Sequence, residues 1–143
     1  MNVGSVMTHD VTVFNPSDSV RAAAEVLKSI NIGSAPVCNG RSLVGIITDR
    51  DIAGRAVADG RDPNHTPVEQ VMTRDVVYCF EDQDVEEVAD AMASSQVRRM
   101  PILNRQHQLV GIVSLGDLAV ELADDQLTGE VLEEVSQPSR PER

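Results

Sequence analysis

The stretch VGSVMTHDV at residues 3–11 returns 65 residues further on, as VEQVMTRDV at residues 68–76. A second pair of stretches extends the match: LVGIITDRD at residues 43–51 returns as LVGIVSLGD at residues 109–117. The repeat runs through most of the 143 residues. A repeat of this length indicates two copies of one supersecondary unit, which sets the architecture of the whole chain.

The hydrophobic periodicity changes in the same order in each copy. Val11 and Val13 predict a short strand that ends at the turn signal Asn15-Pro16. An amphipathic helix follows, with Asp18 or Ser19 as its N-cap in the first copy and Asp84 in the second. The apolar stripe of this helix is Val20, Ala23, Ala24, Leu27 and Ile30 in the first copy, and Val85, Val88, Ala89 and Met92 in the second.

A hairpin and a second helix complete each copy. Two short apolar runs, at residues 35–37 and 43–47, are separated by Asn39-Gly40, which predicts a tight β-hairpin. The expected class is therefore α/β (α+β), with two copies packed sheet to sheet around a pseudo-two-fold axis so that neither exposes its apolar face. The closing helices carry Ile52, Ala53, Ala56 and Val57 in the first copy, and Leu118, Ala119, Leu122 and Ala123 in the second. These stripes exceed what two units can cover, so we expect a homodimer.

Turn residues and composition divide the chain. We expect a first motif at residues 1–60, a linker at 61–67, a second motif at 68–126, and a short helix with a disordered tail at 127–143. Thr66 is the expected N-cap of the helix that restarts the repeat, with Pro67 at its first position and Glu69 completing a capping box.

Composition and charge exclude several classes of protein. The 41% hydrophobic and 24% charged residues are typical of a globular domain. A formal net charge of −11 makes nucleic acid an unlikely partner, because binding to a phosphate backbone needs clustered cations. The same charge argues against anionic membranes, and no stretch reaches the length of a membrane span.

The few special residue types point to no metal or disulfide. Cys38 and Cys79 lie in apolar surroundings without a CxxC partner, so buried free thiols are expected. The three histidines, His9, His65 and His107, have no ligand spacing and are expected at the surface. We expect a cytoplasmic protein, because the N-terminal residues lack the cationic and apolar regions of a signal peptide.

A hydroxyl and a carboxylate three residues apart occur once in each copy, as Thr48 with Asp51 and Ser114 with Asp117. One interpretation is a capping box, which satisfies free amides at a helix start and places negative charge near the helix dipole. The other is a ligand site, because such a carboxylate can accept hydrogen bonds from both hydroxyls of a ribose. The two interpretations are not exclusive.

The sequence resembles the paired cystathionine β-synthase (CBS) domain, also called the Bateman module. The resemblance rests on the repeated Val-Met-Thr-x-Asp-Val start, on Ala35-Pro36-Val37 and Met100-Pro101-Ile102, and on the Gly-Ile-[Ile/Val]-[Thr/Ser]-x-x-Asp segments. It implies βαββα units, two clefts for AMP, ADP, ATP or S-adenosylmethionine, and pairing of two chains. It also implies that Asp51 and Asp117 hold ribose hydroxyls beside Thr48 and Ser114. The adenine would lie against Thr12, Val13, Ser34, Ala35 and Pro36 in one copy, and Val77, Tyr78, Arg99, Met100 and Pro101 in the other.

The two copies differ where a phosphate would be bound. Arg98-Arg99 replaces Gly33-Ser34, and Gly116 replaces Arg50. Adjacent arginines in an acidic chain indicate an anion site, because guanidinium binds phosphate through two parallel hydrogen bonds. Ordinary salt bridges to neighbouring carboxylates explain the same arginines equally well. Non-equivalent sites are expected.

Three functions follow as hypotheses. The first is a stand-alone sensor that binds an adenine nucleotide, needs no cofactor, and changes shape or affinity for an unknown protein target. The second is a dimeric assembly module without a small ligand, in which the hydroxyl and carboxylate pairs only cap helices. The third, an enzyme, lacks support, because no P-loop, GxSxG, HExxH or nucleophile–base pair is present.

Overall fold

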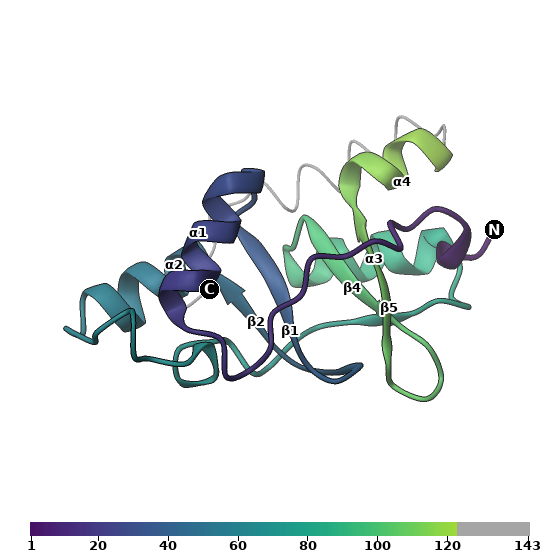
Figure 1. Cartoon of the computed structure of the whole chain (residues 1–143). Helices are drawn as coiled ribbons and strands as arrows, with labels where there is room; N and C mark the ends of the chain where they lie inside the picture. The colour runs from purple at the N-terminus through teal and green to yellow at the C-terminus, as the bar shows by residue number, and fades with distance from the viewer. Residues whose placement is uncertain (123–143) are drawn as a thin grey trace. The chain divides into compact units, whose positions relative to one another are not determined.

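The computed structural model describes residues 1–122 and contains two compact units. The continuous unit is Thr12–Val76, and the discontinuous unit combines Met1–Val11 with the described residues that follow Val76 (Figure 1). This division differs from the sequence repeat, because the first eleven residues pack with the second copy. The expected short helix at residues 127–143 and Ala123 lie outside the described residues.

The continuous unit contains one long helix, a two-stranded antiparallel sheet and a second helix whose later part is π-helical. The helix α1 begins after Ser19, whose hydroxyl accepts a hydrogen bond of 3.0 Å from the amide of Ala22, which confirms Ser19 as the N-cap. The elements are α1 (Val20–Ile30), β1 (Ser34–Asn39), β2 (Ser42–Thr48), α2 (Asp49–Asp51), the π-helical η2 (Ile52–Val57) and the 3-10 turn η3 (Val68–Gln70).

The discontinuous unit repeats this plan with a third strand in its sheet. Its sheet has the order β3 (Cys79–Phe80), β4 (Arg99–Leu103), β5 (Leu109–Ser114). Strand β4 is parallel to β3 and antiparallel to β5. The other elements of this unit are η1 (Val3–Ser5), α3 (Val85–Ser95) and α4 (Leu115–Leu122). The mixed α/β class expected from the sequence is confirmed.

Two local expectations are wrong, and a third is confirmed in position only. Residues 11–13 form no strand; the chain meets β1 only through a single parallel bridge from Phe14 to Val37. Thr66 caps no helix, because its hydroxyl donates to the carbonyl of Asp62 at 2.7 Å and Pro67 takes the N-cap position of η3 without a capping hydrogen bond. Asp84 occupies the N-cap position of α3, but its side chain makes no capping bond.

The repeated Val-Met-Thr segments explain why the units cross the sequence repeat. Thr73 exchanges two backbone hydrogen bonds of 2.8 Å with Ile46 of β2. Thr8 makes the same pair of bonds with Ile112 of β5, at 2.8 and 3.0 Å. Each Val-Met-Thr segment therefore pairs with the free edge of the hairpin of the other copy, and so covers an edge strand. We call residues 3–8 and 68–73 the exchanged segments.

Each unit has its own apolar core, to which the exchanged segment contributes. In the continuous unit, Val68, Val71 and Met72 pack with residues of α1 and the sheet. In the discontinuous unit, Val3 and Met7 pack with α3 and the sheet. None of the helices in residues 1–122 combines the length and apolar character that a bilayer crossing requires.

Candidate functional site

Three segments expected at the first ligand site lie at the same end of the strands in the continuous unit. Ser34 opens β1 and lies opposite Thr48, which ends β2. Phe14 forms a parallel bridge with β1, in which both its amide and its carbonyl are hydrogen-bonded to that strand. Thr12 and Val13 therefore lie toward the end of β1 at which Ser34 is found. The structure thus brings together segments that are widely separated in the sequence.

The second copy repeats this arrangement within the discontinuous unit. Arg99 opens β4 opposite Ser114, which ends β5. Val77 and Tyr78 directly precede β3, which is parallel to β4. The carbonyl of Arg98 accepts a 3.1 Å hydrogen bond from the amide of Leu115, which closes the hairpin where the helix starts.

Side chains at these positions divide into buried and exposed groups. Thr12, Val13, Val77, Tyr78, Arg50, Arg98 and Arg99 are exposed, whereas Ala35, Pro36, Met100 and Pro101 are buried. Ala35 and Met100 belong to the apolar cores of their units.

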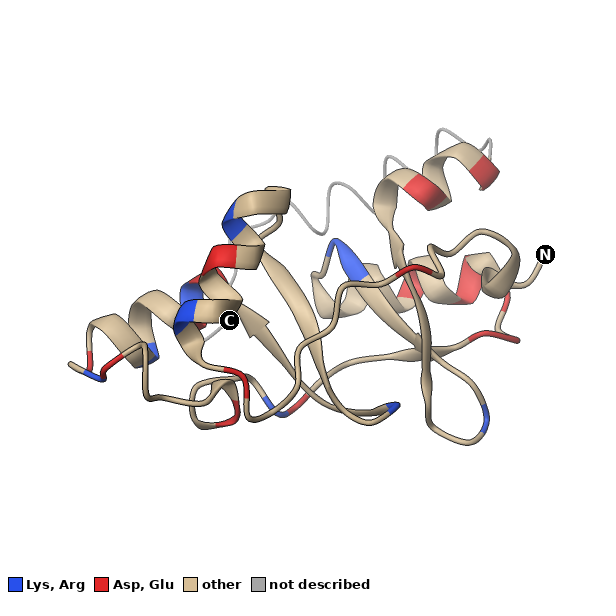
Figure 2. Ribbon diagram, in the orientation of Figure 1, with Lys and Arg blue, Asp and Glu red and all other residues tan. Residues whose placement is uncertain are grey.

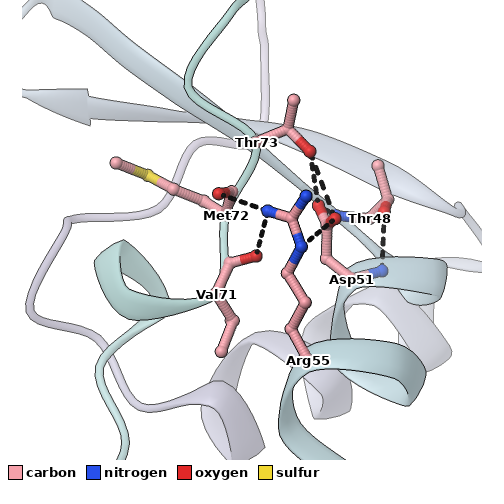
Figure 3. Close-up of polar contacts among 6 residues, drawn as sticks. All are labelled: Thr48, Asp51, Arg55, Val71, Met72 and Thr73. Atoms are coloured by element: carbon pink, nitrogen blue, oxygen red, sulfur yellow. Dashed lines mark hydrogen bonds and ion pairs between the residues drawn. The ribbon is translucent and has the colours of Figure 1, made fainter. Parts of the chain in front are cut away.

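Asp51 is the most constrained polar residue of the site, with only 7% of its surface exposed. Its amide donates to the Thr48 hydroxyl at 2.9 Å, and its carboxylate accepts from the Thr48 amide at 3.1 Å. These bonds form the capping box that the sequence predicted. The Thr73 hydroxyl donates to both carboxylate oxygens, at 3.1 and 3.2 Å (Figure 3).

Arg55 joins this carboxylate to the exchanged segment. Its Nε lies 4.0 Å from Oδ1 of Asp51, one helical turn earlier. Its Nη1 donates to the carbonyls of Met72 and Val71, at 3.1 and 3.4 Å (Figure 3). Arg55 and Thr73 were not among the residues predicted from the sequence, although the four-residue spacing from Asp51 and the repeated threonine of the Val-Met-Thr segment are visible signals.

Asp117 has the same capping geometry with fewer partners. The Ser114 amide donates to its carboxylate at 2.9 Å, and its own amide donates to the Ser114 hydroxyl at 3.2 Å. Within residues 1–122, Thr8 gives it no bond like that of Thr73, and Glu121 stands where the first copy has Arg55. The two carboxylates are therefore not equivalent.

The arginines predicted to bind phosphate are exposed in both units. Arg98 and Arg99 are exposed and form no ion pair within residues 1–122, so salt bridges do not explain them there. Arg50 is exposed on α2.

Tyr78 belongs to an aromatic cluster at the surface of the discontinuous unit. Its ring packs edge-on against Phe80 and His107, with centroid distances of 5.6 and 6.1 Å. Arg105 lies 4.1 Å above the Phe80 ring and forms two hydrogen bonds with Asp82, at 2.7 and 2.8 Å. These contacts hold the exposed Tyr78 ring beside the start of β3.

Both cysteines are free and buried, as the sequence predicted. Burial raises the pKa of the Cys38 thiol. Burial, and secondarily the charge of Glu87, raises the pKa of the Cys79 thiol. The described residues hold no cluster of three or more His, Cys, Asp or Glu side chains able to bind a metal ion.

Some similar proteins match this chain over most of their own length. The CBS domain-containing protein YhcV of Bacillus subtilis is 40% identical over 135 residues, which cover 94% of this chain and 95% of YhcV. Hypoxic response protein 1 of Mycobacterium tuberculosis is 32% identical over 83% of both chains. The crystal structure of hypoxic response protein I with two coordinated zinc ions has a TM-score of 0.76 at 31% identity, covering 85% of this chain and 98% of its own.

A third likeness comes with a bound ligand. The CBS domain pair of protein MJ0100, in complex with 5-methylthioadenosine and S-adenosyl-L-methionine, has a TM-score of 0.71 at 29% identity. The match covers 85% of this chain and 99% of that structure. The family model of the CBS domain matches twice, at residues 3–57 and 68–124. The chain belongs to the CBS domain family and carries two CBS domains.

Proposed function

We propose that this protein is a stand-alone regulatory CBS pair that binds an adenosine-type ligand and signals by changing its conformation or its affinity for a protein target. One observation carries the proposal. In each unit a hydroxyl and carboxylate pair lies at the end of the hairpin where its first strand, β1 or β4, begins. The MJ0100 pair, whose sequence is similar, binds adenosyl ligands.

The positions of the carboxylates and of the strands suggest how an adenosine would be recognised. The carboxylates of Asp51 and Asp117 accept the two ribose hydroxyls, because two oxygens match a vicinal diol. The adenine lies against exposed Val13 or Tyr78 and bonds to the backbone of β1 or β4. At Asp51 the diol takes the place of the Thr73 hydroxyl, which in the present structure donates to both oxygens.

This replacement provides a signal. Arg55 and Thr73 tie Asp51 to the exchanged segment at residues 71–73. A ligand that binds Asp51 favours the state in which these bonds are released, and it shifts the equilibrium by its difference in affinity for the two states. A dimeric assembly module without a small ligand is the competing function, in which the carboxylates only cap helices.

The test compares ribose with deoxyribose ligands. ATP, ADP, AMP and S-adenosylmethionine are each titrated while the melting temperature is followed, and the 2′-deoxy form of each nucleotide is the control. At about 100 times the Kd, a ligand stabilises by about 2.7 kcal/mol, which is several degrees for a domain of this size. We expect a larger shift with at least one ribose form. No shift with any ligand, or equal shifts with both sugars, contradicts the proposed ribose site.

A further inference from the structure

An open pocket of about 750 Å³ lies in the continuous unit, beside the exchanged segment. Three of the twelve Lys and Arg residues of the chain, Arg55, Arg61 and Arg74, line it. This concentration of positive charge is unexpected in a protein with a net charge of −11.

Uncharged acceptors hold the guanidinium groups of Arg61 and Arg74, and they also bind Arg55, which in addition pairs with the carboxylate of Asp51. Arg61 donates to the side-chain oxygen of Gln70 at 2.7 Å, and Arg74 donates to the backbone carbonyl of Glu69 at 3.0 Å. Arg55 donates to backbone carbonyls as described above. Such bonds fix the orientation of a guanidinium without neutralising it, and each group has five N–H donors, so donors remain for a ligand.

Carboxylates of the described residues leave the charges of Arg61 and Arg74 unpaired. Glu69 and Asp75 also line the pocket, but within residues 1–122 neither forms an ion pair with Arg61 or Arg74. Arg55 lies 4.0 Å from Asp51, and its side chain is 53% exposed. The arginines outnumber the carboxylates of the lining by one.

Charge over the two units favours the same location (Figure 2). The continuous unit carries seven Lys and Arg residues against eight Asp and Glu, whereas the described part of the discontinuous unit carries three against nine. The repeat positions that match Arg55 and Arg74 are Glu121 and His9. The cluster therefore belongs to one copy only.

We propose that this pocket binds a phosphate-class oxyanion through Arg55, Arg61 and Arg74. Guanidinium groups form parallel hydrogen bonds to phosphate oxygens, and three such groups match a multiply charged anion such as pyrophosphate. Thr73 and Arg55 both line the pocket and both contact Asp51. The pocket therefore opens beside the carboxylate that, in the proposed function, binds the ribose. The anion is either free or the phosphate chain of a nucleotide held at Asp51.

Calorimetric titration at low ionic strength distinguishes these sources. Pyrophosphate, ATP and adenosine are titrated into the wild type, Arg61→Gln, Arg74→Gln and the double variant. Arg41→Gln is the matched control, because Arg41 is exposed in the same unit and does not line the pocket. Thermal unfolding of each variant verifies that it is folded.

For a free anion, we expect pyrophosphate to bind the wild type and to lose about ten-fold in affinity with each pocket variant but not with Arg41→Gln. For a nucleotide phosphate, we expect ATP to lose about ten-fold while adenosine is unchanged. Added salt should weaken either interaction. Binding of pyrophosphate and ATP that is absent, or equal in all folded variants, overturns the proposal. Absence of adenosine binding alone would count only against the ribose site.

Discussion

The side chain of Met72 occupies the space that a Cβ atom on Gly45 would need. A Cβ built there would lie 2.5 Å from the Met72 sulfur and 2.9 Å from the Thr73 carbonyl oxygen. Gly111 and Met7 repeat this relationship in the other unit. The glycine of each hairpin and the methionine of each exchanged segment therefore fit together, which explains why both motifs occur twice.

Replacement of Gly45 by alanine should destabilise the protein. The added methyl group must displace Met72 or the paired backbone, which costs about 1–3 kcal/mol. Gly54→Ala is the control, because a Cβ at Gly54 meets nothing within 4 Å. This substitution also replaces a helical glycine, so it should not destabilise the protein. Chemical denaturation measures both. Equal stability of the two variants would contradict the close packing.

The buried thiols should make stability fall at high pH. Burial raises the pKa of Cys38 and Cys79 above the ordinary value of 9.0, so the unfolded chain releases these protons first. The contribution to stability is therefore complete below pH 9 and is lost as the pH rises above it. Unfolding is measured from pH 7 to 10, and the control is the Cys38→Ala and Cys79→Ala double variant. An identical pH slope in both proteins would refute this contribution.

Dimer formation is predicted to use the exposed part of the closing helices. The homodimer was predicted because the apolar stripes of these helices exceed what two units can cover, but Ala56 and Leu118 are buried within their own units. Val57 and Val120 are 68% and 78% exposed. We expect light scattering to give about twice the 15.5 kDa chain mass, and Val57→Glu with Val120→Glu to give monomers.

Ile30→Glu is the control for these dimer variants, because Ile30 is 46% exposed at the end of α1, outside both closing helices. Its mass in solution should stay that of the wild type. A wild-type protein that remains monomeric at micromolar concentration would refute the predicted dimer.

The helices and hairpins were predictable because their signals are local. The apolar stripe and Ser19 define α1. Asn39-Gly40 defines the turn between β1 and β2, in which Gly40 has a positive φ of 64°. The exchange of segments was not predictable, because a single strand pairing such as Thr73 with Ile46 leaves no periodic pattern in the sequence.

The candidate site shows the same limit. The capping geometry of Asp51 follows from its spacing to Thr48, and both capping bonds are present. The bonds from Thr73 and Arg55 depend on where the exchanged segment lies, so spacing along the chain does not specify them. The arginine pocket is hidden for the same reason, since residues 55, 61 and 74 converge only after this exchange.

The carboxylates themselves separate the sensor from the assembly module. If Asp51 and Asp117 grip a ribose, substitution by asparagine removes a charge-assisted contact and lowers affinity at that site by about ten-fold or more. If they only cap helices, affinity for any nucleotide is unchanged and only apo stability falls, by about 1 kcal/mol. We expect the loss of affinity in at least one copy.

The structure adds an internal comparison between the two variants. Asp51→Asn also weakens the contacts of a buried carboxylate with Thr73 and Arg55, whereas Asp117 has only its capping bonds among the described residues. Asp51→Asn should therefore cost more apo stability than Asp117→Asn, as chemical denaturation would show. Thr73→Val separates stability from binding, because it removes the internal donor and leaves the carboxylate free for the diol. We expect it to bind adenosine at least as tightly as the wild type. Unchanged nucleotide affinity in Asp51→Asn, Asp117→Asn and the double variant would leave the assembly module as the function of the fold.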